Sequence, residues 1–143
     1  MPEYAPGYLE LVYQQISSTS AVLGGFAIAT LALLLDDAPG RRIASWAAGA
    51  AGMAAGLLIS TTFLAAIVSS DAMKNEALSF ADLTPRVESL VPIVGPLFPL
   101  GIYALLLSLG LSGWIRSPGT GIATSIAALI GAVCVTVGFI AGA

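Results

Sequence analysis

The chain has 143 residues, of which 57% are hydrophobic and 9% are charged, with five basic and eight acidic side chains and a net charge of −3. A soluble domain carries about 25% charged residues, so this chain has too few to cover a globular surface in water. Its high hydrophobicity excludes disorder. Its negative charge, with no basic cluster beyond Arg41–Arg42, argues against nucleic-acid binding. We therefore expect an all-α integral membrane protein.

The numbers of His and Cys residues limit the metal sites and reactions that the chain could support. The chain has no His, which removes imidazole ligands for haem or zinc and the commonest general base. Its single Cys, Cys134, lies in an apolar run and is interpreted as a small packing residue. A disulfide within the chain is therefore excluded, and we expect no cofactor, no metal site and no enzymatic activity.

Four uncharged apolar stretches are each long enough to cross a bilayer, which takes about 20 residues. They cover residues 16–35, 43–68, 91–115 and 119–143. We predict one four-span membrane domain over residues 1–143, a four-helix bundle with an interfacial segment at 69–90. The first helix is expected to begin around Tyr8. Residues 1–15 hold no Lys or Arg, so no cleaved signal peptide is expected there.

The connections place the loops on two sides of the membrane. The first and third loops are tight turns, Asp36–Arg42 and Arg116–Pro118, so the third and fourth spans are predicted to be antiparallel neighbours. These two loops share one side and carry three Arg residues, against Lys74 and Arg86 on the other side. The positive-inside rule therefore favours the first and third loops in the cytoplasm, by a margin of one residue.

The interfacial segment has helical signals of its own. Its apolar residues recur at the spacing of an amphipathic helix face: Met73, Ala77 and Phe80. Thr84 followed by Pro85 is typical of an N-cap and a first helical residue. We expect the third spanning helix to begin near Pro85, with Glu88 at the headgroup level.

Small residues recur at four-residue intervals, which lets helices approach closely in a bilayer. The stripes are Ala44, Ala48, Gly52, Gly56 and Ser60 in the second span, Ser17, Ala21, Gly25 and Ala29 in the first, and Ala123, Ala127 and Gly131 in the fourth. Packing within one bundle explains each stripe separately. Stripes on three of four spans exceed what one small bundle needs, which favours a homo-oligomer.

Three prolines, Pro92, Pro96 and Pro99, fall in the first ten residues of the third span. Each proline removes a helical hydrogen bond and bends the helix. One interpretation is a hinge or a carbonyl-lined ion path. The other, which we favour, is a kinked helix end near the interface, where water satisfies the carbonyls.

No span contains an ionisable acid or base, which argues against proton-coupled transport, voltage sensing and acid–base catalysis. The nearest charged pair is Asp36–Asp37, directly after the first span. In a symmetric ring of subunits, these residues would form a crown of carboxylates at a pore mouth and attract inorganic cations. The alternative is a solvated turn without such a role.

The first span contains the sequence TSAVLGGFA at residues 19–27, which resembles the pore helix of the Orai calcium channels, where the pattern is T-S-A-x-L-x-G-F-A. The sequence LLIST at 57–61 is similar to part of that family's second helix, and Trp114-Ile115-Arg116 to the end of its third. The resemblance implies a ring of subunits with the first helix innermost. The implied pore-lining residues are Val22, Gly25, Phe26, Ala29 and Leu33.

The sequence also departs from the Orai pattern. Leu33 stands where that family has its filter glutamate, and Gln14-Gln15 replaces the basic extension of the pore helix. Orai channels place both termini inside, whereas the Arg count here favours the opposite. The resemblance therefore does not imply calcium selectivity. The sequence is similarly close to small bacterial membrane proteins with a Gly-Phe pair in the first helix.

The leading interpretation is an oligomeric, pore-forming cation channel with the first helix around the axis. We expect it in the lipid bilayer of a prokaryotic inner membrane. The alternative is a non-catalytic accessory or scaffold subunit of a larger membrane complex. A transporter of small neutral solutes through the proline-rich third helix is less favoured.

Overall fold

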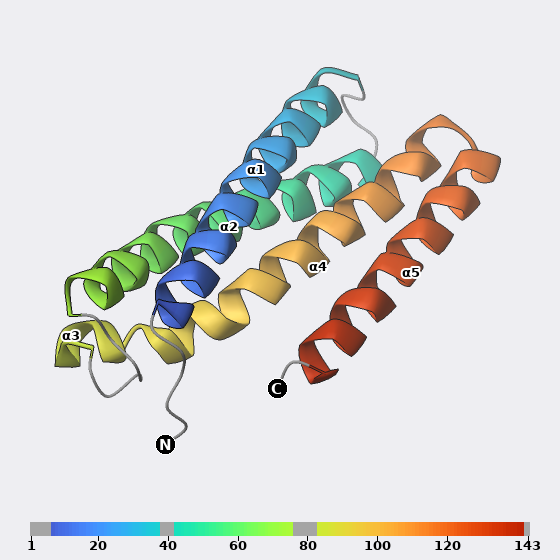
Figure 1. The fold of residues 1–143 in the computed structure, drawn as a ribbon. Helices are drawn as coiled ribbons and strands as arrows, with labels where there is room; N and C mark the ends of the chain where they lie inside the picture. The colour runs from blue at the N-terminus through green and yellow to red at the C-terminus, as the bar shows by residue number, and fades with distance from the viewer. Residues whose placement is uncertain (1–6, 38–41, 76–82, 142–143) are drawn as a thin grey trace.

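The computed structural model describes residues 7–37, 42–75 and 83–141. These residues form five helices: α1 (Tyr8–Asp37), α2 (Arg42–Lys74), α3 (Pro85–Glu88), α4 (Val91–Arg116) and α5 (Pro118–Ala141) (Figure 1). Within these described ranges, four helical stretches are long and apolar enough to cross a membrane. The predicted all-α fold with four candidate spans is therefore confirmed.

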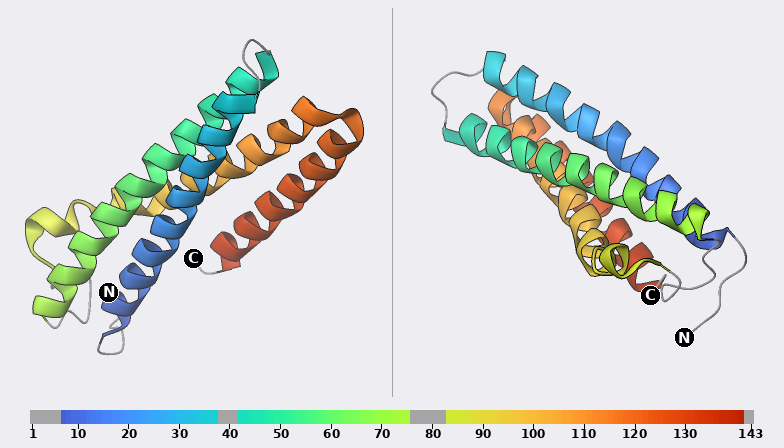
Figure 2. Two further views of the ribbon diagram at one scale, coloured as in Figure 1. Left: turned by 90° about the horizontal axis from the view of Figure 1, so that it is seen from above. Right: turned by 90° about the vertical axis from the view of Figure 1, so that its left-hand side faces the viewer.

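The long helices pack in chain order. Helix α2 packs against both α1 and α4, and α5 packs chiefly against α4 (Figure 2). Helices α4 and α5 are adjacent and antiparallel, as the short turn between them predicts (Figure 1). Helices α1 and α5 are thus the two ends of the row, and each keeps a wide apolar surface uncovered by the rest of the subunit.

The centre of the fold is the face of α2 that meets α4. Its buried residues recur at alternating three- and four-residue steps: Ala47, Ala51, Ala54, Leu58, Thr61, Ala65 and Val68. Small side chains bring the backbones together. A Cβ added to Gly101 of α4 would lie 2.8 Å from Leu58 Cγ. The Ser108 hydroxyl donates to the Ala47 carbonyl oxygen over 3.0 Å, which links the two helices through a buried hydrogen bond.

Helix α2 continues to Lys74, beyond the end predicted at residue 68. The extension is stabilised because its buried residues join a second core cluster contributed by the starts of α1 and α4 and by α3. The members of that cluster are Leu9, Tyr13, Ala65, Val68, Ala72, Leu83, Val87 and Val94. Lys74 in the last turn of α2 also places a positive charge at the negative end of the helix dipole. The first residues of the predicted interfacial segment therefore belong to the spanning helix.

The rest of that segment is described from Leu83 onward. Thr84 is the N-cap of α3 and Pro85 its first residue, as predicted. The Thr84 amide and hydroxyl both donate to Asp71 Oδ2, over 2.9 and 3.2 Å, so α3 is tied to the end of α2. Helix α3 is a single turn, and α4 begins at Val91 after right-handed helical backbone at Ser89 and Leu90. Of the predicted amphipathic face, Met73 is exposed, and Ala77 and Phe80 lie outside the described residues.

Helices α4 and α5 are held together mainly near the turn that joins them. The Thr120 hydroxyl donates to the Gly113 carbonyl over 2.8 Å, and the Thr124 hydroxyl to the Gly110 carbonyl over 3.2 Å. The Trp114 indole N–H donates to Ser125 Oγ over 3.1 Å. Toward the start of α4 and the end of α5 the two helices diverge (Figure 2, left).

The close contact at this turn predicts a strong preference for Gly113. A Cβ there would lie 2.7 Å from the Thr120 carbonyl oxygen and would clash with Thr124 Oγ1. We expect Gly113→Ala to lower the free energy of unfolding by about 1–3 kcal/mol, as overpacking does in general. The measurement is thermal unfolding of the purified protein in detergent, followed by circular dichroism.

Gly119→Ala is the matched control, because nothing in the described part of the chain lies within 4 Å of a Cβ at that position. The control should unfold at or slightly above the wild-type temperature. Equal melting temperatures for the two variants would contradict the close contact at Gly113.

Candidate functional site

The five residues predicted to line a pore lie on one exposed face of α1. Val22 and Leu33 are 73% and 71% exposed, and Gly25, Phe26 and Ala29 are exposed as well. The opposite face of α1 is buried, through Leu9, Tyr13, Ser20, Gly24 and Ala27. The structure therefore places the predicted set together on the surface that the subunit itself leaves uncovered.

Asp36 lies in the last turn of α1 and is exposed. It follows Ala29 by seven residues, which is close to two helical turns, so it continues the exposed face toward the membrane surface. The last turn of α1 contains no basic residue. The helix dipole does not favour a carboxylate at the C-terminal end of a helix. The position of Asp36 therefore does not indicate that it stabilises α1. Asp37 ends the helix, and its side chain lies outside the described residues.

The small-residue stripe predicted on α2 divides between two surfaces. Ala44 and Ala48 are buried and Gly52 is half-buried, whereas Gly56 and Ser60 are exposed. The reason is geometric, because a strict four-residue step advances about 40° around an α-helix with each repeat. The stripe therefore begins in the helix contacts of the subunit and ends on its outer surface.

The hydroxyl groups of the long helices satisfy backbone carbonyls. Thr30 donates to the Phe26 carbonyl, Thr61 to that of Leu57 and Thr62 to that of Leu58, all over 2.8 to 2.9 Å. The Ser17 hydroxyl crosses from α1 to the Thr62 carbonyl on α2, over 3.1 Å. These hydroxyls have structural roles, as back-bonding hydroxyls commonly do in helices.

The described residues contain no group of three His, Cys, Asp or Glu side chains able to hold a metal ion.

Ser20 differs from the other hydroxyls. It is fully buried on the packed face of α1, and its Oγ has no hydrogen-bond partner among the described residues. Sequence reasoning gave Ser20 only as part of the motif at residues 19–27. Which side of the helix it occupies depends on the packing of α1 against α2, so its burial could not be read from the sequence.

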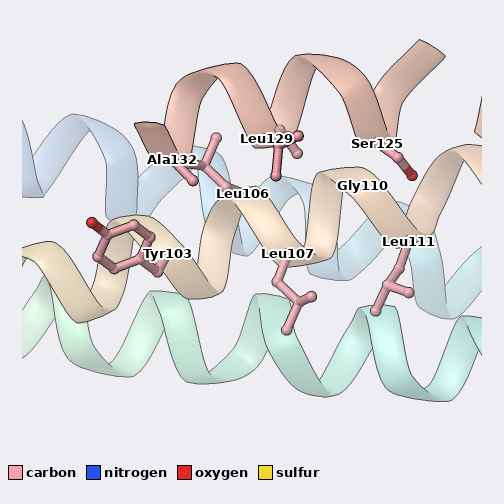
Figure 3. A pocket seen from close by; sticks show the side chains of 9 residues that line it. Tyr103, Leu106, Leu107, Gly110, Leu111, Ser125, Leu129 and Ala132 are labelled. Atoms are coloured by element: carbon pink, nitrogen blue, oxygen red, sulfur yellow. The ribbon is translucent and has the colours of Figure 1, made fainter. Parts of the chain in front are cut away.

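The three predicted hinge residues line a groove between α4 and α5. Pro92 lies in the first turn of α4, and Pro96 and Pro99 lie inside the helix. The groove has two parts, with volumes of about 600 Å³ at the start of α4 and about 310 Å³ nearer the turn. The residues of the first part are Pro92, Gly95, Pro96, Pro99, Leu100, Tyr103, Thr136 and Ile140. Figure 3 shows the second part, between Tyr103 and Leu111 on α4 and between Ser125 and Ala132 on α5.

Tyr103 belongs to both parts of the groove and marks the boundary between them. Its hydroxyl lies 2.6 Å from Thr136 Oγ1, and Thr136 donates to the Ala132 carbonyl over 2.7 Å. Because Thr136 has one proton and gives it to Ala132, Tyr103 is the donor in the bond between the two side chains. Sequence reasoning missed this pair, since Thr136 lies 33 residues from Tyr103 and only the antiparallel turn brings them together.

These features define a multi-pass, all-α membrane protein whose charged residues lie at the ends of its candidate spans or between them. Searches of protein-family models, of curated proteins and of solved structures find no match to this chain. The function therefore has to be inferred from the residues and their arrangement.

The hydrogen bond between Tyr103 and Thr136 should couple α4 to α5. We expect a double-mutant cycle of Tyr103→Phe and Thr136→Val to give an interaction energy of about 1 kcal/mol in the free energy of unfolding. The measurement is denaturant unfolding of the four proteins in detergent. Additive effects of the two substitutions would show that the bond contributes nothing to holding the helices together.

Proposed function

We propose that the protein is a homo-oligomeric membrane pore that conducts cations. In this pore, the α1 helices of all subunits surround the central axis. The observation that carries the proposal is the uncovered face of α1, where Val22, Gly25, Phe26, Ala29 and Leu33 lie in line with Asp36. The packed face of the same helix holds it against α2, so the uncovered face is available to the axis of a ring.

The small residues on this face support the proposal. A Cβ at Gly25 would contact nothing in the described part of the chain within 4 Å, so no packing within the subunit requires glycine there. In a bilayer, small residues on a helix surface allow close approach of another helix. Copies of α1 around one axis would use Gly25 and Ala29 in this way.

The outer face of α2 offers a contact between subunits. Ser45, Gly49, Gly56 and Ser60 are exposed and repeat near the helical period, so they form a strip of small residues along α2, beside the exposed Met53. A Cβ at Gly49 or Gly56 would meet nothing within 4 Å in the described residues. An α2 strip against a neighbouring subunit would hold the ring together.

The side chains on α1 suggest how such a pore would behave. Phe26 and Leu33 would form apolar rings, and hydrophobic constrictions close pores by excluding water. Asp36, at the end of the same face, would raise the local concentration of cations at the mouth. Because of Asp36, we expect a preference for cations over anions. Because Leu33 supplies no ion ligand, we expect no calcium selectivity.

The lining role of Leu33 is tested by cysteine modification in liposomes. In a Cys134→Ala background, which removes the exposed native thiol, a positively charged thiol reagent should reduce cation flux through Leu33→Cys by more than half. The charge attached to the pore wall would repel permeating cations. The control is Leu129→Cys, on an exposed part of α5. Equal effects at the two positions would contradict a pore lined by α1.

The carboxylate mouth is tested by replacing Asp36 and Asp37 with Asn. We expect cation flux to fall about tenfold at low ionic strength and less at high salt, because electrostatic attraction at a pore mouth is screened by ions. Glu10→Gln, at the opposite end of α1, is the control. A cation preference unchanged in the double variant would show that these carboxylates do not attract the permeating ion.

A further inference from the structure

The wider part of the groove between α4 and α5 combines apolar walls with unusual backbone chemistry. Its side chains are apolar except for the hydroxyls of Tyr103 and Thr136, which are already paired with each other. Its volume of about 600 Å³ falls in the range of ligand pockets, about 300–1,000 Å³. The groove is thus large enough for part of a small molecule or for a lipid chain.

Two backbone carbonyls in this groove lack their normal helical donors. Pro96 and Pro99 carry no N–H, so the carbonyls of Pro92 and Gly95, four residues earlier, receive no such hydrogen bond. Both Pro92 and Gly95 line the groove. At membrane depth a carbonyl without a partner is unfavourable, so the groove favours a ligand that donates hydrogen bonds.

An acidic residue lies four residues before the first lining residue of the groove. Glu88 is exposed and ends α3, four residues before Pro92, and Ser89 and Leu90 between them have right-handed helical backbone. Pro92 also leaves the Glu88 carbonyl without its helical donor. Arg86 is two residues earlier, about 200° around the helix from Glu88, and so points to another side. Among the described residues, the carbonyl acceptors of the groove are thus preceded along the chain by the Glu88 carboxylate, which would attract a cationic donor.

We propose that this groove binds a membrane phospholipid with a primary ammonium headgroup, of the phosphatidylethanolamine type. One acyl chain lies along the apolar wall past Pro99 and Ile140. The ammonium group donates to the Pro92 and Gly95 carbonyls and is attracted by the Glu88 carboxylate.

The depth of the acceptors fits a lipid headgroup. Helix α4 begins at Val91, so Pro92 lies about 1.5 Å and Gly95 about 6 Å along the helix from its first residue, at a rise of 1.5 Å per residue. The headgroup layer accounts for about 5–8 Å on each side of the hydrocarbon core. With the start of α4 in that layer, the Pro92 and Gly95 carbonyls lie where the ammonium of a lipid can reach them while its acyl chain enters the core.

The test compares two lipids that differ only at the nitrogen. The full chain, purified in detergent, is titrated with dioleoyl phosphatidylethanolamine or dioleoyl phosphatidylcholine, and bound lipid is counted by native mass spectrometry. Phosphatidylcholine has no N–H to donate. We expect about tenfold tighter retention of phosphatidylethanolamine, the equivalent of one charge-assisted hydrogen bond. Equal retention of the two lipids would overturn the proposal.

Two variants locate the site. Leu100→Trp fills the groove and should abolish the retention of phosphatidylethanolamine. Its control is Ile126→Trp on α5, since both positions are 53% exposed in the wild type. Pro96→Ala returns an N–H to the Pro92 carbonyl, so it should reduce the preference between the two lipids and leave the groove open. Retention in Leu100→Trp equal to that of its control, or an undiminished preference in Pro96→Ala, would place the lipid elsewhere.

Discussion

The structure depends on close backbone contact along α2. In a bilayer the hydrophobic effect does not draw helices together, because lipid tails are as apolar as leucine side chains. Packing of small residues has to supply the attraction instead, and α2 provides it with a run of buried alanines that meets α4 and, along its flank, α1. Gly101 on α4 and Gly24 on α1 complete these contacts against Leu58. Helix α5 has no comparable contact with α2, and it is held by hydrogen bonds and glycines near its turn.

The positions of the spans could be predicted from the sequence because charge placement alone determines them. Every Asp, Glu, Lys and Arg lies at the end of a span or between spans, which follows from the cost of burying a charge in hydrocarbon. The predicted second span ends at residue 68, and the helix that contains it continues to Lys74. A helix can continue above the hydrocarbon, with charged residues such as Asp71 and Lys74, when other parts of the chain cover it. Leu9, Leu83 and Val87 provide that cover.

Which face of each helix packs inside the subunit is harder to predict from the sequence than where the helix ends. Between Ala44 and Gly56, every residue of α2 except Trp46 and Met53 is Ala, Gly or Ser, so the sequence does not distinguish a residue that packs inside the subunit from one that faces outward. The four-residue stripe from Ala44 to Ser60 crosses from one surface to the other, and the alternating three- and four-residue pattern identifies the packed side. The pairing of Tyr103 with Thr136 and the burial of Ser20 likewise depend on how whole helices are placed against each other.

Two of the uncovered surfaces differ in chemistry. The face of α1 ends in a carboxylate and carries small residues, which suits an axis shared with other copies. The groove of α4 and α5 has apolar walls and two carbonyls, of Pro92 and Gly95, that lack the N–H donor four residues later, which suits lipid. The most direct test of this arrangement is electron-microscopic imaging of the full chain in lipid nanodiscs. A rotationally symmetric homomer with α1 innermost and α4–α5 toward lipid is the expected result. A monomer, or a ring with α5 at its centre, would contradict it.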